Sequence, residues 1–181
     1  MLGVGQELLD FNVVGVKPKF ENHEENGESA FETINKNSFA DKWKVIFFYP
    51  KDFTFICPTE IVEYAKLNQE FLDRDCIVLG GSPANEHCKL AWSRAHKDLN
   101  KLDQWSFSDT EGTLVDALGI RSEEGVALRA TYIVDPHNII QHVSVNNLNV
   151  GRNPSETLRI LDGLQTDELC PCNRPVGGET I

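Results

Sequence analysis

The side chains with the greatest chemical potential are the five cysteines of a 181-residue chain. They are Cys57, Cys76, Cys88, Cys170 and Cys172. Five is an odd number, and a chain of this length buries a sizeable core without disulfide staples. Each thiol is therefore a packing residue, a metal ligand or a reactive nucleophile.

Cys57 lies in the segment PKDFTFICPTE, residues 50–60. The pattern predicts a strand-to-helix connection that ends at Cys57, with Pro58 at the first helical position. A thiol placed there faces unpaired backbone N–H groups and the positive end of the helix dipole. Both favour the thiolate, which is the nucleophilic form. A buried core thiol is the plainer interpretation of this residue.

Three other side chains could assist this thiol. The Thr54 hydroxyl is close enough in sequence to hydrogen-bond the sulfur or a bound oxygen, and Pro50 stiffens the turn and shields it from water. Arg129 is the candidate cation, on an expected strand over residues 126–134. A Cys–His protease is disfavoured, because no histidine lies near Cys57 in sequence and no glycine-rich elbow surrounds it.

Alternating strands and helices must position these residues. Strands are expected at 43–50, 76–80, 126–134 and 139–145, and helices at 58–72, 84–100, 110–118 and 153–164. The alternation predicts a sheet with parallel pairs, covered by helices. The polar stretch 21–29 is expected to be a loop within an N-terminal hairpin. Residues 1–164 form one domain, and residues 165–181 are a C-terminal arm of the same unit.

Composition excludes several classes of protein. Apolar residues make up 40% and charged residues 25%, and 17 Lys+Arg against 28 Asp+Glu give a net charge of −11. This balance disfavours binding to nucleic acid or to an anionic membrane surface. The sequence shows neither a long apolar run nor a basic leader, so a cytoplasmic location is expected.

The sequence resembles the peroxiredoxins. Pro50, Thr54 and Cys57 match their P-x-x-x-T-x-x-C motif, and FFYPKDFTFICPTE is similar to the typical 2-Cys subfamily, in particular its bacterial alkyl hydroperoxide reductase branch. The resemblance continues through Arg129 in LRATYIVD, Arg152 at the end of VNNLNVGR, and ELCPCN at 168–173. It implies an α/β thioredoxin-like fold with a central mixed β-sheet flanked by helices, an N-terminal hairpin and a C-terminal arm.

The resemblance also implies roles for the residues around Cys57. The Cys57 thiolate would attack a peroxide and become a sulfenic acid. Thr54 and Arg129 would hold the peroxide, and Pro50 would exclude water. Glu60 and Arg152 would form a charged network around Arg129. Their plainer interpretation is a surface carboxylate and a loop cation.

The cysteines near the C-terminus would complete the cycle. The resemblance implies that Cys170 resolves the sulfenic acid by forming an intersubunit disulfide with Cys57. Cys172 is a second resolving thiol or an exchange partner for the reductant. A zinc site at these two thiols lacks further ligands. Cys76 and Cys88 are expected to pack.

The implied activity is reduction of hydrogen peroxide and alkyl hydroperoxides without metal, haem, flavin or another cofactor. The reductant would be a dithiol protein: a thioredoxin-like protein, a flavoprotein disulfide reductase or a dedicated adaptor. Dimers assembled into a ring-shaped decamer are implied. An oligomeric holdase or a peroxide-sensing relay is the alternative. A dithiol oxidoreductase is disfavoured because Cys57 has no C-x-x-C partner.

Two departures from a common family pattern bear on overoxidation. The Gly-Gly-Leu-Gly insertion is absent from residues 93–108, and no extra C-terminal helix with a Tyr-Phe pair is present. Nothing would then brace the helix against unwinding. The enzyme is therefore expected to resist sulfinic overoxidation.

Overall fold

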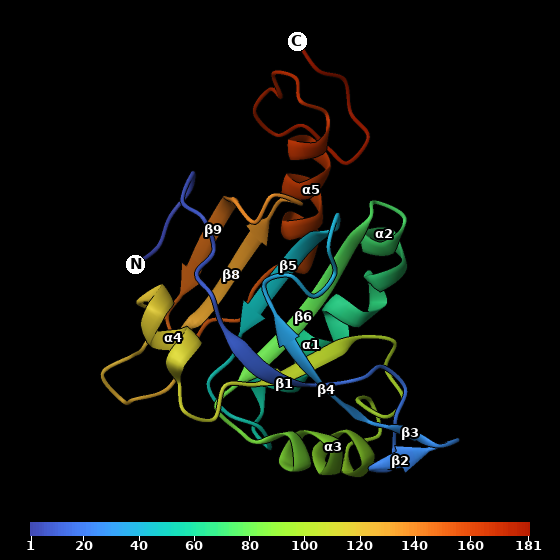
Figure 1. Cartoon of the computed structure of the whole chain (residues 1–181). Coiled ribbons are helices and arrows are strands. Elements are labelled where there is room, and N and C mark those ends of the chain that lie inside the picture. The colour runs from blue at the N-terminus through green and yellow to red at the C-terminus, as the bar shows by residue number, and fades with distance from the viewer.

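The computed structural model describes all residues, 1–181, and seven of its strands form one mixed sheet (Figure 1). Their order is β4-β1-β7-β6-β5-β8-β9, and β2 and β3 form a separate two-stranded hairpin. The strands are β1 (Asn12–Val16), β2 (Glu24–Glu25), β3 (Glu28–Ser29), β4 (Phe31–Asn35), β5 (Trp43–Phe48), β6 (Cys76–Ser82), β7 (Trp105–Ser108), β8 (Arg129–Val134) and β9 (Ile140–Asn146). The β5–β6 and β6–β7 pairs are parallel and the others antiparallel. This confirms the predicted thioredoxin-like mixed sheet.

The central strand β5 is buried on both faces. Val45 and Phe47 belong to one apolar cluster, whereas Ile46 and Phe48 belong to another. Successive side chains of a strand point to opposite faces, so the two clusters lie on the two sides of the sheet. The β-branched and aromatic run at residues 43–48 therefore indicated a buried strand correctly.

Helices cover both faces of the sheet (Figure 1). They are α1 (Ile56–Lys66), α2 (Asn68–Leu72), α3 (Glu86–Ala95), α4 (Thr113–Leu118) and α5 (Pro154–Gln165). The buried residues of α4 belong to the cluster on one face, and those of α1, α2 and α5 belong to the cluster on the other. None of the five helices combines the length and the apolar composition that a membrane span requires.

Two helices differ from their predicted bounds. The predicted helix 58–72 is interrupted at Leu67, and the buried Asn68 amide donates to the Asp103 carbonyl, a contact distant in sequence. The predicted helix 84–100 ends at Ala95, because His96 adopts an extended conformation. The first strand after α4 is also shorter than predicted and begins at Arg129.

The two predicted hairpins and the start of α5 follow the sequence closely. The strand β7 was not predicted, and β2 and β3 form a short hairpin within residues 21–29, which were expected to be a loop. β8 and β9 pair antiparallel across the turn 135–138, and β1 pairs antiparallel with β4. The Asn153 side chain accepts from the Ser155 N–H at the start of α5, as expected for a helix cap. Gly119 ends α4 with φ of 70°.

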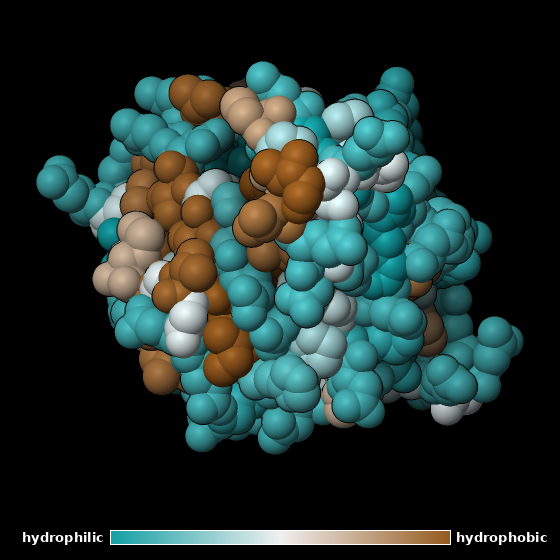
Figure 2. Space-filling model, turned by 90° about the horizontal axis from the view of Figure 1, so that it is seen from above, coloured by the Kyte–Doolittle hydropathy of each residue, from teal (hydrophilic) through white to brown (hydrophobic).

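The chain after α5 contains neither helix nor strand, yet it is tied to that helix (Figure 1). The Asp162 carboxylate accepts from Arg174 at 2.7 Å and from the Gly177 N–H at 2.9 Å. Figure 2 views this end of the molecule and shows apolar surface among mostly hydrophilic residues. The exposed large apolar side chains of the tail are Leu169, Val176 and Ile181.

Candidate active site

Cys57 lies at the junction between β5 and α1. It is the second residue of α1, so Pro58 is the third helical residue rather than the first. The early position suits proline, whose missing N–H would find no partner in the first turn of a helix. The Cys57 side chain is completely buried, in the apolar cluster that also holds Phe47 and Tyr64. The plainer interpretation, a buried thiol, is thus right about burial.

Burial at this position is accompanied by a positive charge. An Arg129 terminal nitrogen lies 3.5 Å from the Cys57 sulfur. The antiparallel register places Thr131 opposite Phe47, so Arg129, two residues earlier on β8, lies beside the end of β5. Its Nε donates to the Leu148 carbonyl at 2.7 Å, which fixes the plane of the guanidinium.

Glu60 links Arg129 to Arg152. Its Oε2 accepts from Arg129 at 2.7 Å and from Arg152 at 2.8 Å, and its Oε1 accepts from the Nε of Arg152 at 2.9 Å. The three side chains are 2 to 4% exposed. This burial excludes the interpretation of Glu60 and Arg152 as an ordinary surface carboxylate and loop cation. The two guanidiniums share one carboxylate, so the cluster carries a net positive charge next to Cys57.

Thr54 and Pro50 lie in the connection that precedes α1. The Thr54 hydroxyl donates to the Lys51 carbonyl at 3.0 Å and makes no hydrogen bond with the Cys57 sulfur. Of the two expected partners, the sulfur and a bound oxygen, the second stays a prediction. A hydroxyl in an irregular turn readily bonds a nearby backbone group. Pro50 is half-buried at the end of β5. Both residues therefore belong to the segment that leads to Cys57, and neither forms a hydrogen bond with its sulfur.

The other four cysteines are also free thiols. Cys170 and Cys172 are exposed on the tail, and the Cys170 sulfur lies 3.5 Å from the Thr166 hydroxyl. Cys76 is buried, as expected for a packing residue, and burial raises its pKa to about 12. Cys88 is half-buried on α3, whose buried side chains are instead Lys89, Leu90 and Trp92.

A buried polar cluster that the sequence did not predict holds the connection leading to Cys57. The Lys89 ammonium, the Asp52 carboxylate and the Ser82 hydroxyl are mutually hydrogen-bonded. The one sequence signal for a buried lysine was its spacing: Lys89 lies three residues before Trp92, and both are on the buried face of α3. Asp52 stands in the very segment that carries Pro50 and Thr54.

Taken together, these contacts describe a thiol shielded from water beside a positive charge. The Arg129 guanidinium is permanently charged, and its terminal nitrogen lies against the buried Cys57 sulfur. A cysteine side chain in such a place can attack a small electrophile without a cofactor. A thioredoxin-like sheet with an arginine-paired thiol at a helix start defines a cysteine-dependent oxidoreductase.

Comparison with known proteins identifies the family. A profile described as "AhpC/TSA family" matches residues 4–143, so the chain belongs to the AhpC/TSA family of peroxiredoxins. It is 50% identical over 154 residues to alkyl hydroperoxide reductase C of Mycolicibacterium smegmatis. The matched segment covers 85% of this chain and 79% of that protein. It is 38% identical over 187 residues to a chloroplastic 2-cysteine peroxiredoxin of Chattonella marina, which covers 98% and 91%.

Solved structures show the same fold. Mycobacterium bovis AhpC superposes with a TM-score of 0.87 at 42% identity, over 96% of this chain and 98% of that chain. The reduced 2-Cys peroxiredoxin of Plasmodium vivax superposes with a TM-score of 0.88 at 30% identity, over 99% and 93%. The homology assigns the chain thiol-dependent peroxidase chemistry.

Proposed function

We propose that this chain reduces hydrogen peroxide and alkyl hydroperoxides, with Cys57 as the attacking thiol. The observation that carries the proposal is the buried Cys57 sulfur 3.5 Å from an Arg129 nitrogen. The relatives named as alkyl hydroperoxide reductase C and 2-cysteine peroxiredoxin support the substrate class.

In the first step the Cys57 thiolate attacks the terminal oxygen of the peroxide. A sulfur–oxygen bond forms and the O–O bond breaks, so sulfur is oxidised to the sulfenic acid and the peroxide is reduced. The leaving oxygen takes the electron pair, gains a proton equivalent to the one that the Cys57 thiol released on ionising, and departs as water or an alcohol. Arg129 stabilises the charge that develops on that oxygen.

Thr54 has a complementary role in this step. Its hydroxyl has one proton, which is donated to the Lys51 carbonyl, so its lone pairs remain free to accept. A hydroperoxide O–H can donate to those lone pairs. Thr54 would thus orient the substrate as an acceptor, while half-buried Pro50 limits access of water.

In the second step the Cys170 thiol attacks the Cys57 sulfenic sulfur, water leaves, and a disulfide forms. The buried Cys57 sulfur must first become accessible, which requires the first turn of α1 to unwind. Cys170 is exposed on a segment without regular structure, which suits this approach. We assign the bond to two subunits of a homodimer, with Cys172 as a neighbouring exchange thiol.

A dithiol protein would then reduce the disulfide by thiol–disulfide exchange. The exposed apolar residues of the tail support docking of the tail on a second subunit of the same protein. A ring of such dimers and a cytoplasmic location stay predictions from the sequence.

The test replaces Cys57, Cys170 and Cys172 with serine one at a time and adds peroxide. We expect Cys57→Ser to lose turnover and every disulfide-linked dimer on a non-reducing gel. Cys170→Ser should still consume one equivalent of peroxide without forming the dimer. Dimers that persist in Cys170→Ser would transfer the resolving role to Cys172, and peroxide turnover by Cys57→Ser would overturn the proposal.

A further inference from the structure

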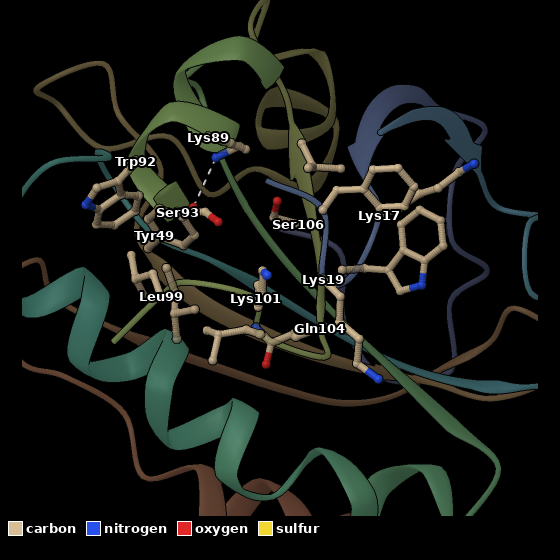
Figure 3. A pocket seen from close by; sticks show the side chains of 15 residues that line it. Lys17, Lys19, Tyr49, Lys89, Trp92, Ser93, Leu99, Lys101, Gln104 and Ser106 are labelled. Atoms are coloured by element: carbon tan, nitrogen blue, oxygen red, sulfur yellow. Dashed lines mark hydrogen bonds between the residues drawn. The ribbon is translucent and has the colours of Figure 1, made fainter. Parts of the chain in front are cut away.

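Lys89 is a buried lysine outside the arginine-paired site. Its ammonium, on α3, donates to the Ser82 hydroxyl at 2.7 Å, the Tyr49 hydroxyl at 3.0 Å and the Asp52 carboxylate at 3.2 Å. Figure 3 shows the Lys89–Tyr49 bond at the edge of a small cavity. The three donors of the ammonium are thus all used.

Burial of this pair is unfavourable unless its geometry is good. The Lys89 and Asp52 side chains are each 2% exposed. Burial lowers the pKa of Lys89, and the Asp52 carboxylate opposes that shift. Burial also raises the pKa of Tyr49 well above its usual value, so its hydroxyl stays neutral. A buried ion pair seldom adds much stability, so the Lys89–Asp52 pair is better explained by the segment that it holds in place.

Asp52 anchors the connection between β5 and α1. Its carboxylate, bonded to Ser82 and Lys89, makes the only hydrogen bonds between residues 50–54 and other elements. Within the connection Phe53 has φ of 55°, an uncommon conformation for an aromatic residue. Phe53 is also 57% exposed, and its ring contacts only one aromatic side chain, Trp92 of α3, at 5.7 Å between centroids. The Asp52 hydrogen bonds and this contact both tie the connection to α3 and its neighbours.

We propose that Lys89 is a positioning residue for peroxide reduction. It acts through Asp52: their ion pair holds residues 50–54 so that Pro50 and Thr54 stay beside the Cys57 thiol. The inference rests on the proposed function, in which Cys57 attacks the peroxide. Lys89 would thus support residues 50–54 from α3. This support is separate from the ion network of Glu60, Arg129 and Arg152.

The adjoining cavity indicates how the site would respond to loss of the ammonium. It has a volume of about 60 Å³ and is lined in part by Tyr49, Lys89 and Trp92. This volume accommodates a few water molecules. In Lys89→Met, water from the cavity would replace the ammonium, and Asp52 would be held by the Ser82 hydroxyl alone.

The test compares Lys89→Met, Asp52→Asn and the double variant with wild type. Stopped-flow fluorescence measures oxidation of Cys57 by hydrogen peroxide, and mass spectrometry follows its alkylation by iodoacetamide. Each single variant should lose about 10- to 100-fold in the peroxide rate, since misplacement near a reacting group has effects of that size. Alkylation needs access to the sulfur but no peroxide geometry, so its rate should stay the same or rise.

The double variant tests whether Lys89 acts through Asp52. If it does, the double variant loses no more than either single variant, because one interaction has been removed in all three. Losses that multiply would overturn the proposal. Each single variant leaves one buried charge without its partner, whereas the double variant leaves none. Where a single variant fails to fold, the double variant alone decides, and a wild-type peroxide rate in it refutes the positioning role.

Two controls distinguish failure of the positioning role of Lys89 from failure of the proposed peroxidase function. Lys42→Met removes an exposed pair with Asp75 at the other end of β5, and its peroxide rate should stay within about threefold of wild type. Peroxide turnover by wild type that is lost in Cys57→Ser supports the proposed function. In that case, a wild-type peroxide rate in folded Lys89→Met or in Asp52→Asn refutes the positioning role alone.

Discussion

Arg129 approaches the Cys57 sulfur at 3.5 Å through the same nitrogen that donates to Glu60 at 2.7 Å. The guanidinium is thus shared between a fixed carboxylate and a thiol whose charge changes during the reaction. Its direction is set by Glu60 and by the Leu148 carbonyl. The position of the positive charge therefore depends on residues that do not touch the sulfur.

Glu60→Gln is expected to weaken both stability and activity. The change keeps the shape of the side chain but leaves Arg129 and Arg152 buried without their shared anion. Removal of one partner of a buried ion pair lowers the free energy of unfolding by about 3 to 5 kcal/mol. The peroxide rate should fall by about 10-fold or more, because the guanidinium loses its fixed direction.

Denaturant unfolding and stopped-flow oxidation measure these two effects. Glu63→Gln is the matched control, since Glu63 lies on the same helix and forms only an exposed pair with Lys66. Its free energy of unfolding should change by less than about 0.5 kcal/mol. Equal stabilities of the two variants would contradict the buried network.

The start of α1 is expected to unwind easily. Phe55 precedes the helix and its side chain forms no capping hydrogen bond. Rapid unwinding exposes Cys57 to resolution before a second peroxide reacts, so sulfinic acid should be scarce. Phe55→Ser introduces a hydroxyl that can cap the first-turn N–H groups. Residue 55 has helical rather than extended φ and ψ, so the stabilisation should be below the about 1 kcal/mol of a well-formed cap, and sulfinic acid formation should increase.

Mass spectrometry after turnover at rising peroxide concentrations checks this prediction. Phe55 is almost fully exposed, so the substitution removes little packing. Inactivation of the wild-type enzyme at micromolar peroxide would contradict the expected resistance. An unchanged sulfinic fraction in Phe55→Ser would show that unwinding does not limit resolution.

Local patterns predicted most of the sheet and the start of α5, because these depend on neighbouring residues. The apolar run at residues 43–48 and the Asn153–Pro154 pair are of this kind. The break at Leu67 was missed because the bond from Asn68 to the Asp103 carbonyl joins residues far apart in sequence.

The site residues likewise fall into those that local sequence indicates and those that depend on contacts distant in sequence. The helix-start position predicted the environment of Cys57, and the family resemblance indicated Glu60 and Arg152. The Lys89–Asp52 pair escaped both, because a lysine on a helix normally faces solvent and its partner lies on another element. The Thr54 hydroxyl donates to the nearby Lys51 carbonyl and not to the thiol, because the turn of the backbone brings that carbonyl within reach.

Cys76 should be inert in the native protein over the pH range where an ordinary thiol ionises. Burial raises its pKa to about 12 from an ordinary value of 9.0, so its thiolate is scarce at neutral pH. Alkylation followed by mass spectrometry should label exposed Cys170 and Cys172 first and Cys76 only on unfolding. Early labelling of Cys76 would show that this strand opens.

The same shift affects stability at high pH. The protonated thiol is favoured in the folded state, so its contribution is complete below 9.0 and is lost as pH rises toward about 12. The unfolded chain releases this proton first in that window. Cys76→Ala should remove this part of the alkaline dependence, measured as the free energy of unfolding against pH.

Asp162 should control how tightly the tail is held. Burial would raise its pKa, but hydrogen bonds from Gly177, Arg174 and Arg74 outweigh that effect and lower it below the ordinary 3.8. The contribution of the carboxylate is therefore present above 3.8 and is lost as pH falls through the lowered value. Asp162→Asn should release the tail already at neutral pH.

Hydrogen exchange of residues 166–181 and alkylation of Cys170 measure this release. Both should become faster in Asp162→Asn, because Arg74, Arg174 and Gly177 lose the anion and are left with one side-chain oxygen to accept their hydrogen bonds. Asp167→Asn, at an exposed position, is the control and should change neither. If Cys170 reacts at the wild-type rate in Asp162→Asn, the carboxylate does not restrain the thiol. If it reacts faster and disulfide formation with Cys57 also accelerates, detachment of the tail limits resolution.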